Sequence, residues 1–383
     1  MDTRIVRNLF KEKFGTEGML YFSPGRINLI GEHTDYNGGC VLPGAIDKGI
    51  LAEIKPNGTD KVRAYSADLQ AYAEFGLNEE DKPEASWAHY IFGVCREMLK
   101  RGAQIKGFDT VFSGDVPLGA GLSSSAALES TFAFALNEIY KAGFDKKELV
   151  LTGQKTEHHY CGVNCGIMDQ FAIAMGKAGH AIFLDTATLK YEYAPIKLEN
   201  AKIVISCSNK KRGLGDSKYN ERRSECETAL AELQKVVKID SLGELTEEQF
   251  EQYKDAIKDP VRVKRAKHAV YENQRTIKAV EALKNNDVAL FGELMNASHV
   301  SLRDDYEVTG IELDTLVEEA WKVDGVIGSR MTGAGFGGCT VSIVKDEAVD
   351  SFIEKVGAAY KDKIGYAADF YVVEIGDGPV KLD

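Results

Sequence analysis

No apolar run in this 383-residue chain approaches the length that a bilayer-spanning helix needs, so the sequence predicts no membrane partner. A signal peptide is not expected either. Residues 1–15 alternate charged side chains with Val6, Leu9, Phe10 and Phe14, which predicts a short amphipathic helix. The chain has no internal repeat and no low-complexity segment. A cytoplasmic location is therefore expected.

Cysteine and positive charge are both limited. Seven cysteines at irregular spacing favour a reducing compartment over a disulfide framework. The net charge is -12, and Lys and Arg are scattered, which argues against binding to nucleic acid or to an anionic membrane. Any phosphate that the protein binds must therefore be held by a local motif.

The length and the order of elements predict an α+β protein of two domains with a cleft between them. Strand-like and helical segments alternate without a regular βαβ rhythm. Strands are expected at residues 20–23, 49–54, 110–113, 340–344 and 370–374. Helices are expected at residues 87–100, 123–143, 146–159, 221–237, 263–284, 287–299 and 348–360. The second domain is expected to begin within residues 182–206.

The segment from Gly25 to Gly39 crowds charged and polar side chains at the end of an apolar run. Within it stand Arg26, Glu32, His33 and Asp35. Burying such groups is costly unless a polar ligand completes their hydrogen bonds. The segment therefore indicates a pocket for a polyol or a sugar.

A glycine-rich loop runs directly into a helix at Pro117 to Ala126. Gly119 and Gly121 allow a tight turn, and the helix end offers free N–H groups and a partial positive charge to an anion. A serine hydroxyl from this loop could also reach a magnesium ion. The alternative is a turn followed by a helix that the serines cap.

Two common nucleotide motifs are excluded. No Walker A sequence occurs, because no Gly-Lys-Ser/Thr follows the glycines. Residues 333–338 match G-x-G-x-x-G, but a strand follows them where a dinucleotide fold requires a helix. A glycine turn that passes close to a ligand or to the first glycine loop is the better interpretation.

The segment from Glu157 to Phe171 is a third candidate. Its His and Cys residues have no second pair at a zinc-binding spacing, so a metal-thiolate site is not expected. Asp169 stands among Ile167, Met168 and Phe171, where a bare carboxylate would be costly. A helix N-cap or a buried salt bridge is the alternative to a functional role.

Together these segments resemble the galactokinase family, which is related to the homoserine, mevalonate and phosphomevalonate kinases. Gly25–Gly39 is similar to the galactokinase signature, Pro117–Ala127 to the phosphate loop, and Met331–Cys339 to the third glycine motif. Further similar segments are 165–171, 218–223, 265–275 and 298–308.

The resemblance implies two α/β-type domains with the active site in the cleft between them. An N-terminal domain would span residues 1–181 and a C-terminal domain residues 182–367. The strand within residues 368–383, near 370–374, would return to the N-terminal domain. A monomer is expected, with a weak dimer as the alternative.

By the same resemblance, the chain would transfer the γ-phosphate of ATP to the C1 hydroxyl of α-D-galactose. Asp169 and Arg26 would be catalytic, with Asp169 acting as the base or only orienting the hydroxyl. The implied sugar ligands are Glu32, His33, Asp35, Gly166, Asp169 and Tyr219. The implied ATP site comprises Trp87, Tyr90, Gly119, Ala120, Gly121, Leu122, Ser123, Ser124, Ser125, Gly333 and Gly335. Mg²⁺ would be held by Ser125 and Glu157.

Two alternatives stay open. One is a sensor that binds galactose and ATP without catalysis. Relatives of that kind lack a Ser-Ala pair in the phosphate loop, whereas Ser125-Ala126 is present here. The other is a kinase for N-acetylgalactosamine or L-arabinose. Relatives acting on N-acetylgalactosamine differ around Thr34 and residues 37–39, where this chain has the galactose-type pattern.

Overall fold

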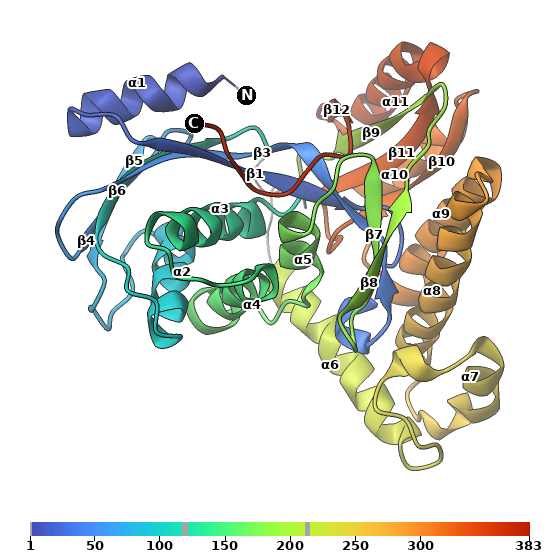
Figure 1. Cartoon of the computed structure of the whole chain (residues 1–383). Helices are drawn as coiled ribbons and strands as arrows, with labels where there is room; N and C mark the ends of the chain where they lie inside the picture. Colours follow the sequence, from blue (N-terminus) through green and yellow to red (C-terminus); the bar gives the residue numbers. More distant parts are fainter. Residues whose placement is uncertain (1, 117–121, 211–214) are drawn as a thin grey trace.

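The computed structural model describes residues 2–116, 122–210 and 215–383. Two sheets, each covered by helices, lie side by side, with a small three-stranded sheet near the junction between them (Figure 1). Within the described parts of the chain, no helix is long and apolar enough to cross a membrane.

The first sheet has six strands in the order β13-β1-β3-β6-β4-β5. Its strands are β1 (Met19–Asn28), β3 (Pro43–Pro56), β4 (Lys61–Ser66), β5 (Ala71–Gly76), β6 (Phe108–Gly114) and β13 (Val380–Lys381). The pairs are antiparallel except β4 with β6. One face carries α1 (Thr3–Phe14), whose Val6 and Phe10 pack on Leu20, Leu51 and Val111.

Four helices cover the opposite face of this sheet (Figure 1). They are α2 (Ala88–Lys100), α3 (Ser124–Ile139), α4 (Lys146–Thr156) and α5 (Met168–Ala174). A reciprocal capping box between Asp145 and Glu148 begins α4. A π-helical turn, η2 (Glu157–Cys161), follows α4 directly. This turn carries one of the predicted site residues.

The second sheet has four antiparallel strands in the order β10-β11-β9-β12. They are β9 (Ala201–Cys207), β10 (Val326–Thr332), β11 (Cys339–Lys345) and β12 (Asp369–Val373). Side chains alternate along β9. Val204 packs with α10 (Gly310–Ala320) and α11 (Val349–Ile364), whereas Ile203 and Ile205 pack in a cluster that includes Ile27 and Leu29. The apolar half of the 25–39 segment is therefore fixed against the second sheet.

The remaining helices extend from this half of the molecule: α6 (Gly215–Leu233), α7 (Glu247–Tyr253), α8 (Pro260–Lys284) and α9 (Val288–Ser301). The helix expected from residue 263 begins at Pro260, because Asp259 caps it and proline is well suited to the first helical position. The small sheet comprises β2 (Cys40–Val41), β7 (His180–Asp185) and β8 (Lys190–Pro195).

The placement of the C-terminal strand differs from the expectation. Residues 369–373 form β12 and pair with β9 in the second sheet, so a return of that strand to the N-terminal domain is wrong. Only β13, at Val380–Lys381, pairs with β1 in the first sheet. Along β12, Val373 is buried in the apolar cluster that includes side chains of β9 and β11. The proposed domain boundary at 181/182 falls inside β7, and the division into two domains stays a prediction.

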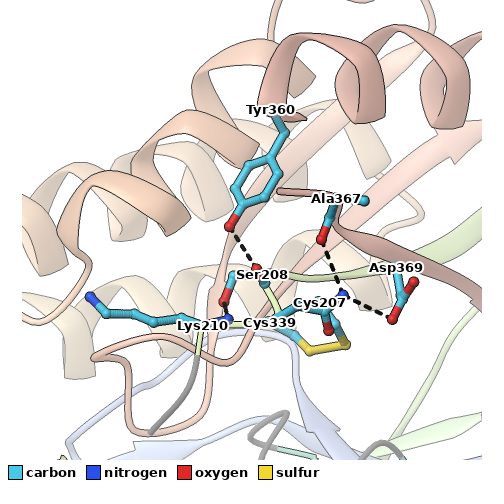
Figure 2. Close-up of a disulfide and its surroundings, with 8 residues drawn as sticks. Cys207, Ser208, Lys210, Cys339, Tyr360, Ala367 and Asp369 are labelled. Carbon is cyan, nitrogen blue, oxygen red and sulfur yellow. Dashed lines mark hydrogen bonds between the residues drawn. A yellow bond between two sulfur atoms is a disulfide. The ribbon is translucent and has the colours of Figure 1, made fainter. Parts of the chain in front are cut away.

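One disulfide joins Cys207 of β9 to Cys339 of β11, which are register partners with Cα atoms 4.2 Å apart (Figure 2). The five other cysteines are free. The irregular cysteine spacing gave no sign of this pair, because only strand register brings together two residues 132 positions apart. Cys339 directly follows the 333–338 loop, and Ser208, the residue after Cys207, donates from its N to Gly338 O at 2.8 Å.

Candidate active site

A cavity of about 170 Å³ gathers side chains from all three predicted site segments. They come from β1 and the loop after it, the start of α3, η2, the start of α5, α6 and the 333–338 loop. The lining residues are Arg26, Glu32, His33, Asp35, Ser125, Glu157, Val163, Cys165, Gly166, Met168, Asp169, Tyr219, Gly333, Ala334, Gly335 and Phe336.

Arg26 and Asp169 form a two-point ion pair at this cavity. Arg26 Nε donates to Asp169 Oδ1 at 2.9 Å, and Nη2 donates to Oδ2 at 2.8 Å. The arginine side chain is 5% exposed and the aspartate side chain 29%. Asp169 is not the N-cap of α5, because Ile167 holds that position. It is a salt-bridged carboxylate whose remaining surface faces the cavity, where it can still accept a hydrogen bond.

The serines at the start of α3 do not cap the helix in the expected way. Ser123 has a left-handed backbone, with φ 60°, and makes no side-chain cap hydrogen bond. Its hydroxyl donates instead to Asp169 Oδ2. Ser125 faces the cavity, together with Glu157 at the start of η2. A hydroxyl and a nearly buried carboxylate thus both line the cavity.

Glu32 is buried and already held by protein donors. Its Oε1 accepts from Gly333 N at 2.7 Å and from Arg330 Nη1 at 3.3 Å, and its Oε2 accepts from Asn28 Nδ2 at 2.9 Å. Burial raises the pKa of Glu32, and the Arg330 and Arg26 guanidiniums oppose that rise. Each carboxylate oxygen has two acceptor positions, so Glu32 can still accept from a sugar hydroxyl.

Asp35 lies at the start of the short 3₁₀ turn η1 (Asp35–Asn37) and faces Gly166. A side chain at Gly166 would overlap the Asp35 carboxylate, which explains the glycine there. Burial, followed by the negative charges of Asp169 and Glu32, raises the pKa of Asp35 to about 7. Three carboxyl groups thus share one end of the cavity.

The His33 ring contacts the protein at both of its nitrogens. Its Nδ1 lies 2.7 Å from Tyr36 Oη, and its Nε2 lies 3.1 Å from Ala334 O. Both ring nitrogens therefore have protein partners. Tyr219 packs beside this ring, with 5.6 Å between the ring centroids, and also lines the cavity.

Family comparisons agree with this arrangement. The galactokinase galactose-binding signature matches residues 8–56, the GHMP kinases N terminal domain residues 89–177, and the GHMP kinases C terminal model residues 279–362. A curated galactokinase from Clostridium beijerinckii is 55% identical over 99% of this chain and 98% of its own. Another, from Lactiplantibacillus plantarum, is 52% identical over the full length of both chains.

The chain belongs to the galactokinase family. It is thus an ATP-dependent sugar kinase. Among solved structures, Lactococcus lactis galactokinase complexed with galactose has a TM-score of 0.96 and 48% identity, covering 98% of both chains. A mevalonate kinase matches the fold at 21% identity, with a TM-score of 0.65 and coverage of 94% of this chain and 100% of its own.

Against this family background, the predicted ATP residues divide into four groups, apart from Ser124, which begins α3 and does not line the cavity. Ser125, Gly333 and Gly335 line the cavity. Leu122 is buried in an apolar cluster, and Ser123 is bonded to Asp169. Gly119, Ala120 and Gly121 lie outside the described residues. Trp87 and Tyr90 do not line this cavity; they pack on the core below the first sheet, where the Trp87 ring meets Phe112 at 5.5 Å.

Sequence reasoning missed the buried residues that form hydrogen bonds with the galactokinase signature. Arg330 lies in β10 and is fully buried; its Nη1 donates to Asn28 O at 3.0 Å and its Nε to Ser298 Oγ at 3.1 Å. Glu272 of α8 accepts from Gly31 N at 3.0 Å. The only sign of Arg330 in the sequence was its charge within a run that resembles a strand, and nothing in the sequence indicated which residues it contacts.

Proposed function

We propose that this chain transfers the γ-phosphate of ATP to the C1 hydroxyl of α-D-galactose and releases α-D-galactose 1-phosphate and ADP. The observation that carries the proposal is the Arg26–Asp169 pair in one cavity with Glu32, Asp35, Ser125 and Glu157. The names of the relatives and the galactose in the L. lactis structure support the choice of sugar.

The sugar would lie against Glu32, Asp35, the Gly166 backbone and Tyr219. Carboxylates accept hydrogen bonds from neighbouring hydroxyls, and tyrosine offers both a hydroxyl and a flat apolar face. The raised pKa of Asp35 gives this group a proton to donate near neutral pH, so that it can act as donor or acceptor. The His33 ring is not included as a direct ligand, because both of its nitrogens are engaged.

The reaction would take place at Asp169. Phosphoryl transfer requires mainly positioning and neutralisation of charge. Asp169 would accept the hydrogen bond of the C1 hydroxyl and take its proton as the oxygen bonds to phosphorus. Arg26 would keep Asp169 oriented through their two hydrogen bonds and would counter the charge on the transferred group. The Ser123 hydroxyl shares one oxygen of Asp169 and would help to fix that carboxylate.

Ser125 and Glu157 fit a magnesium ion that arrives with ATP. Mg²⁺ prefers oxygen ligands, takes one or two from the protein, and keeps waters and phosphate oxygens for the rest. The Ser125 hydroxyl and the carboxylate of Glu157, a residue that is 7% exposed, both line the cavity and match that donor set. In the parts of the chain described here, no cluster of three or more His, Cys, Asp or Glu side chains could hold a metal by itself. The bound ion would neutralise phosphate charge.

The adenine would lie toward Trp87 and Tyr90, and the protein would act in the cytoplasm as a monomer. Trp87 lies just before α2 and Tyr90 lies within it. Both are on the same side of the first sheet as the start of α3.

A coupled ADP-release assay over a panel of monosaccharides tests the proposal. Galactose should give the highest kcat/KM, and N-acetylgalactosamine and L-arabinose much lower values. Tight galactose binding without ADP release would favour the sensor instead. Release of galactose 1-phosphate of the other anomer, visible by NMR, would contradict the stereochemistry.

A further inference from the structure

Two consecutive residues of the Gly25–Gly39 segment, called the sugar segment below, form hydrogen bonds with two consecutive residues of the third glycine motif. Glu32 Oε1 accepts from Gly333 N at 2.7 Å, and His33 Nε2 lies 3.1 Å from Ala334 O. These contacts cross from the loop after β1 to the loop between β10 and β11. The two loops line the same cavity.

The Ala334 carbonyl decides where the His33 proton lies. A carbonyl oxygen can only accept, so Nε2 must carry the hydrogen and donate it. In a neutral imidazole, Nδ1 is then an acceptor. The Tyr36 hydroxyl must therefore donate to Nδ1 across 2.7 Å.

The same reasoning orders a longer chain of hydrogen bonds. The Tyr36 hydroxyl donates its only hydrogen to His33, so its oxygen accepts a hydrogen bond from the Tyr306 hydroxyl at 2.7 Å. The Tyr306 oxygen in turn accepts from the thiol of Cys226, with 3.2 Å between the atoms. Tyr306 belongs to the π-helical turn η5 (Leu302–Tyr306), and Cys226 to α6. The hydrogen bonds therefore all donate in the same direction, from Cys226 of α6 through Tyr306, Tyr36 and His33 to the glycine loop.

The surroundings favour the neutral imidazole. Burial, followed by the nearby His268, Arg222 and Arg330, lowers the pKa of His33 to about 3, and the hydrogen bond to the Ala334 carbonyl opposes this shift. Tyr219 and Tyr306 cover the ring, with centroids at 5.6 and 4.8 Å. A protonated ring would donate at both nitrogens, which would reverse its hydrogen bond with Tyr36.

The glycine loop needs such an external restraint. Gly333, Gly335, Gly337 and Gly338 have positive φ values of 86°, 80°, 111° and 88°. Phe336 also has a positive φ, of 59°. This backbone path forms no regular structure of its own, and glycines leave it many alternatives. His33 itself has φ 62°, an uncommon conformation for a histidine and a mark of a functional position.

We propose that His33 is a positioning residue, which as a neutral Nε2–H imidazole holds the 333–338 loop against the sugar segment rather than binding the sugar through its ring. The glycine loop then stands ready for the phosphates whenever Glu32 and His33 are in place. The part played by the phosphates rests on the proposed function. The position of the proton does not.

The first test reads the proton directly. In protein labelled with ¹⁵N-histidine, long-range ¹H–¹⁵N spectra should show His33 with a protonated Nε2 and a bare Nδ1 from about pH 5 to pH 9. Loss of the signal in His33→Asn, a residue that tolerates positive φ, assigns it. A doubly protonated ring, or a proton on Nδ1, would overturn the proposal.

The second test separates positioning from sugar binding by calorimetry. His33→Phe keeps a ring but loses both hydrogen bonds, so it should weaken binding of a non-hydrolysable ATP analogue with Mg²⁺ on the order of tenfold. Galactose affinity should stay within about twofold, because the variant leaves Glu32 and Asp35 unchanged.

Tyr36→Phe removes only the hydroxyl and should show the same pattern at on the order of fivefold. If His33→Phe does not fold, Tyr36→Phe still allows nucleotide affinity to be compared with galactose affinity. Tyr140→Phe is the matched control, since it deletes a hydroxyl bonded to Gly107 O, far from the cavity. The reverse pattern, weak galactose and unchanged nucleotide binding, would make His33 a sugar ligand. Both titrations remain measurable if the wild-type protein fails to phosphorylate galactose, which would refute only the proposed function.

Discussion

Replacing the buried Arg330 by methionine should both destabilise the protein and make galactose binding depend on pH. Arg330 is 0% exposed and donates to Asn28 O, Glu32 Oε1 and Ser298 Oγ. Its Nη2 also lies 3.9 Å from Glu272 Oε1. Methionine fills much of the same volume but leaves these acceptors without a cation.

The size of the effect follows from the two carboxylates left behind. Removing one partner of a buried ion pair typically costs about 3–5 kcal/mol, because the other charge stays buried without compensation. Glu272 retains Arg275, whose Nε donates to it at 2.8 Å, so the larger change falls on Glu32. We therefore expect a loss near the lower figure, about 3 kcal/mol, in the free energy of unfolding.

The pH dependence follows from Glu32. Burial raises its pKa, and Arg330 is the largest influence that opposes the rise. Without Arg330 the pKa of Glu32 rises further, so the carboxyl takes up a proton as the pH falls toward neutral. A protonated Glu32 accepts less well from sugar hydroxyls. Galactose affinity of the variant should then improve as the pH is raised from about 6 to 9, whereas the wild-type affinity changes less.

Urea unfolding and calorimetric titration with galactose, both across that pH range, measure the two effects. The double variant Arg330→Met/Glu32→Gln should lose the variant's extra pH dependence, because no carboxyl remains to titrate. Arg63→Met is the control: it removes a two-point pair with Asp109 in the first sheet, so it should cost stability without any pH effect on galactose. A stability loss under about 1 kcal/mol for Arg330→Met, or a pH effect that survives in the double variant, would refute the reasoning.

Three further predictions concern the cavity and the disulfide. Asp169→Ala should keep the circular dichroism spectrum and abolish ATP-dependent phosphorylation of galactose in the ADP-release assay; near-normal turnover would remove its catalytic role. The pKa of Asp35 is raised to about 7 from an ordinary 3.8, so the folded state holds a proton that the unfolded state has lost, and its contribution to stability falls as the pH rises from about 4 to 7. Asp35→Asn should therefore flatten the pH dependence of the urea midpoint and raise the galactose KM; parallel midpoint curves would show that Asp35 ionises normally. Cys207→Ala should lower the free energy of unfolding by about 2–4 kcal/mol relative to the oxidised protein, because the bond closes a loop between residues 132 positions apart in the unfolded chain. With a reductant present the two proteins should unfold alike, and equal midpoints without reductant would mean that the thiols are free.

Much of the local structure could be predicted from periodicity and end signals. The helix expected at 146–159 begins at Lys146 with a capping box, and the strand expected at 340–344 lies within β11. The strands β4 and β8 were missed, since they are short and half exposed and their polar residues resemble a loop. The placement of β12 was wrong because pairing depends on which sheet edge is free, and no local pattern records that.

In the candidate site too, the sequence predicted the functional residues but not the partners that they contact. Residue types at close spacing indicated Glu32, Asp35 and Asp169 as a polar-ligand set, because charged groups among apolar neighbours need partners. The partners themselves come from far along the chain: Arg26 reaches Asp169 across 143 positions, and Glu32 meets Gly333 across 301. Such pairs depend on how helices and strands from distant parts of the chain pack together.

The sequence by itself thus determined the family, the two glycine motifs and most of the residues around the cavity, since each is a local pattern of residue types. Only the tertiary structure decided that the Ala334 carbonyl takes the His33 proton, that Arg330 stands behind Glu32, and that Cys207 faces Cys339. The reason is physical: a hydrogen bond, an ion pair or a disulfide requires two groups within a few ångströms, and that closeness is set by the sheets' register and packing.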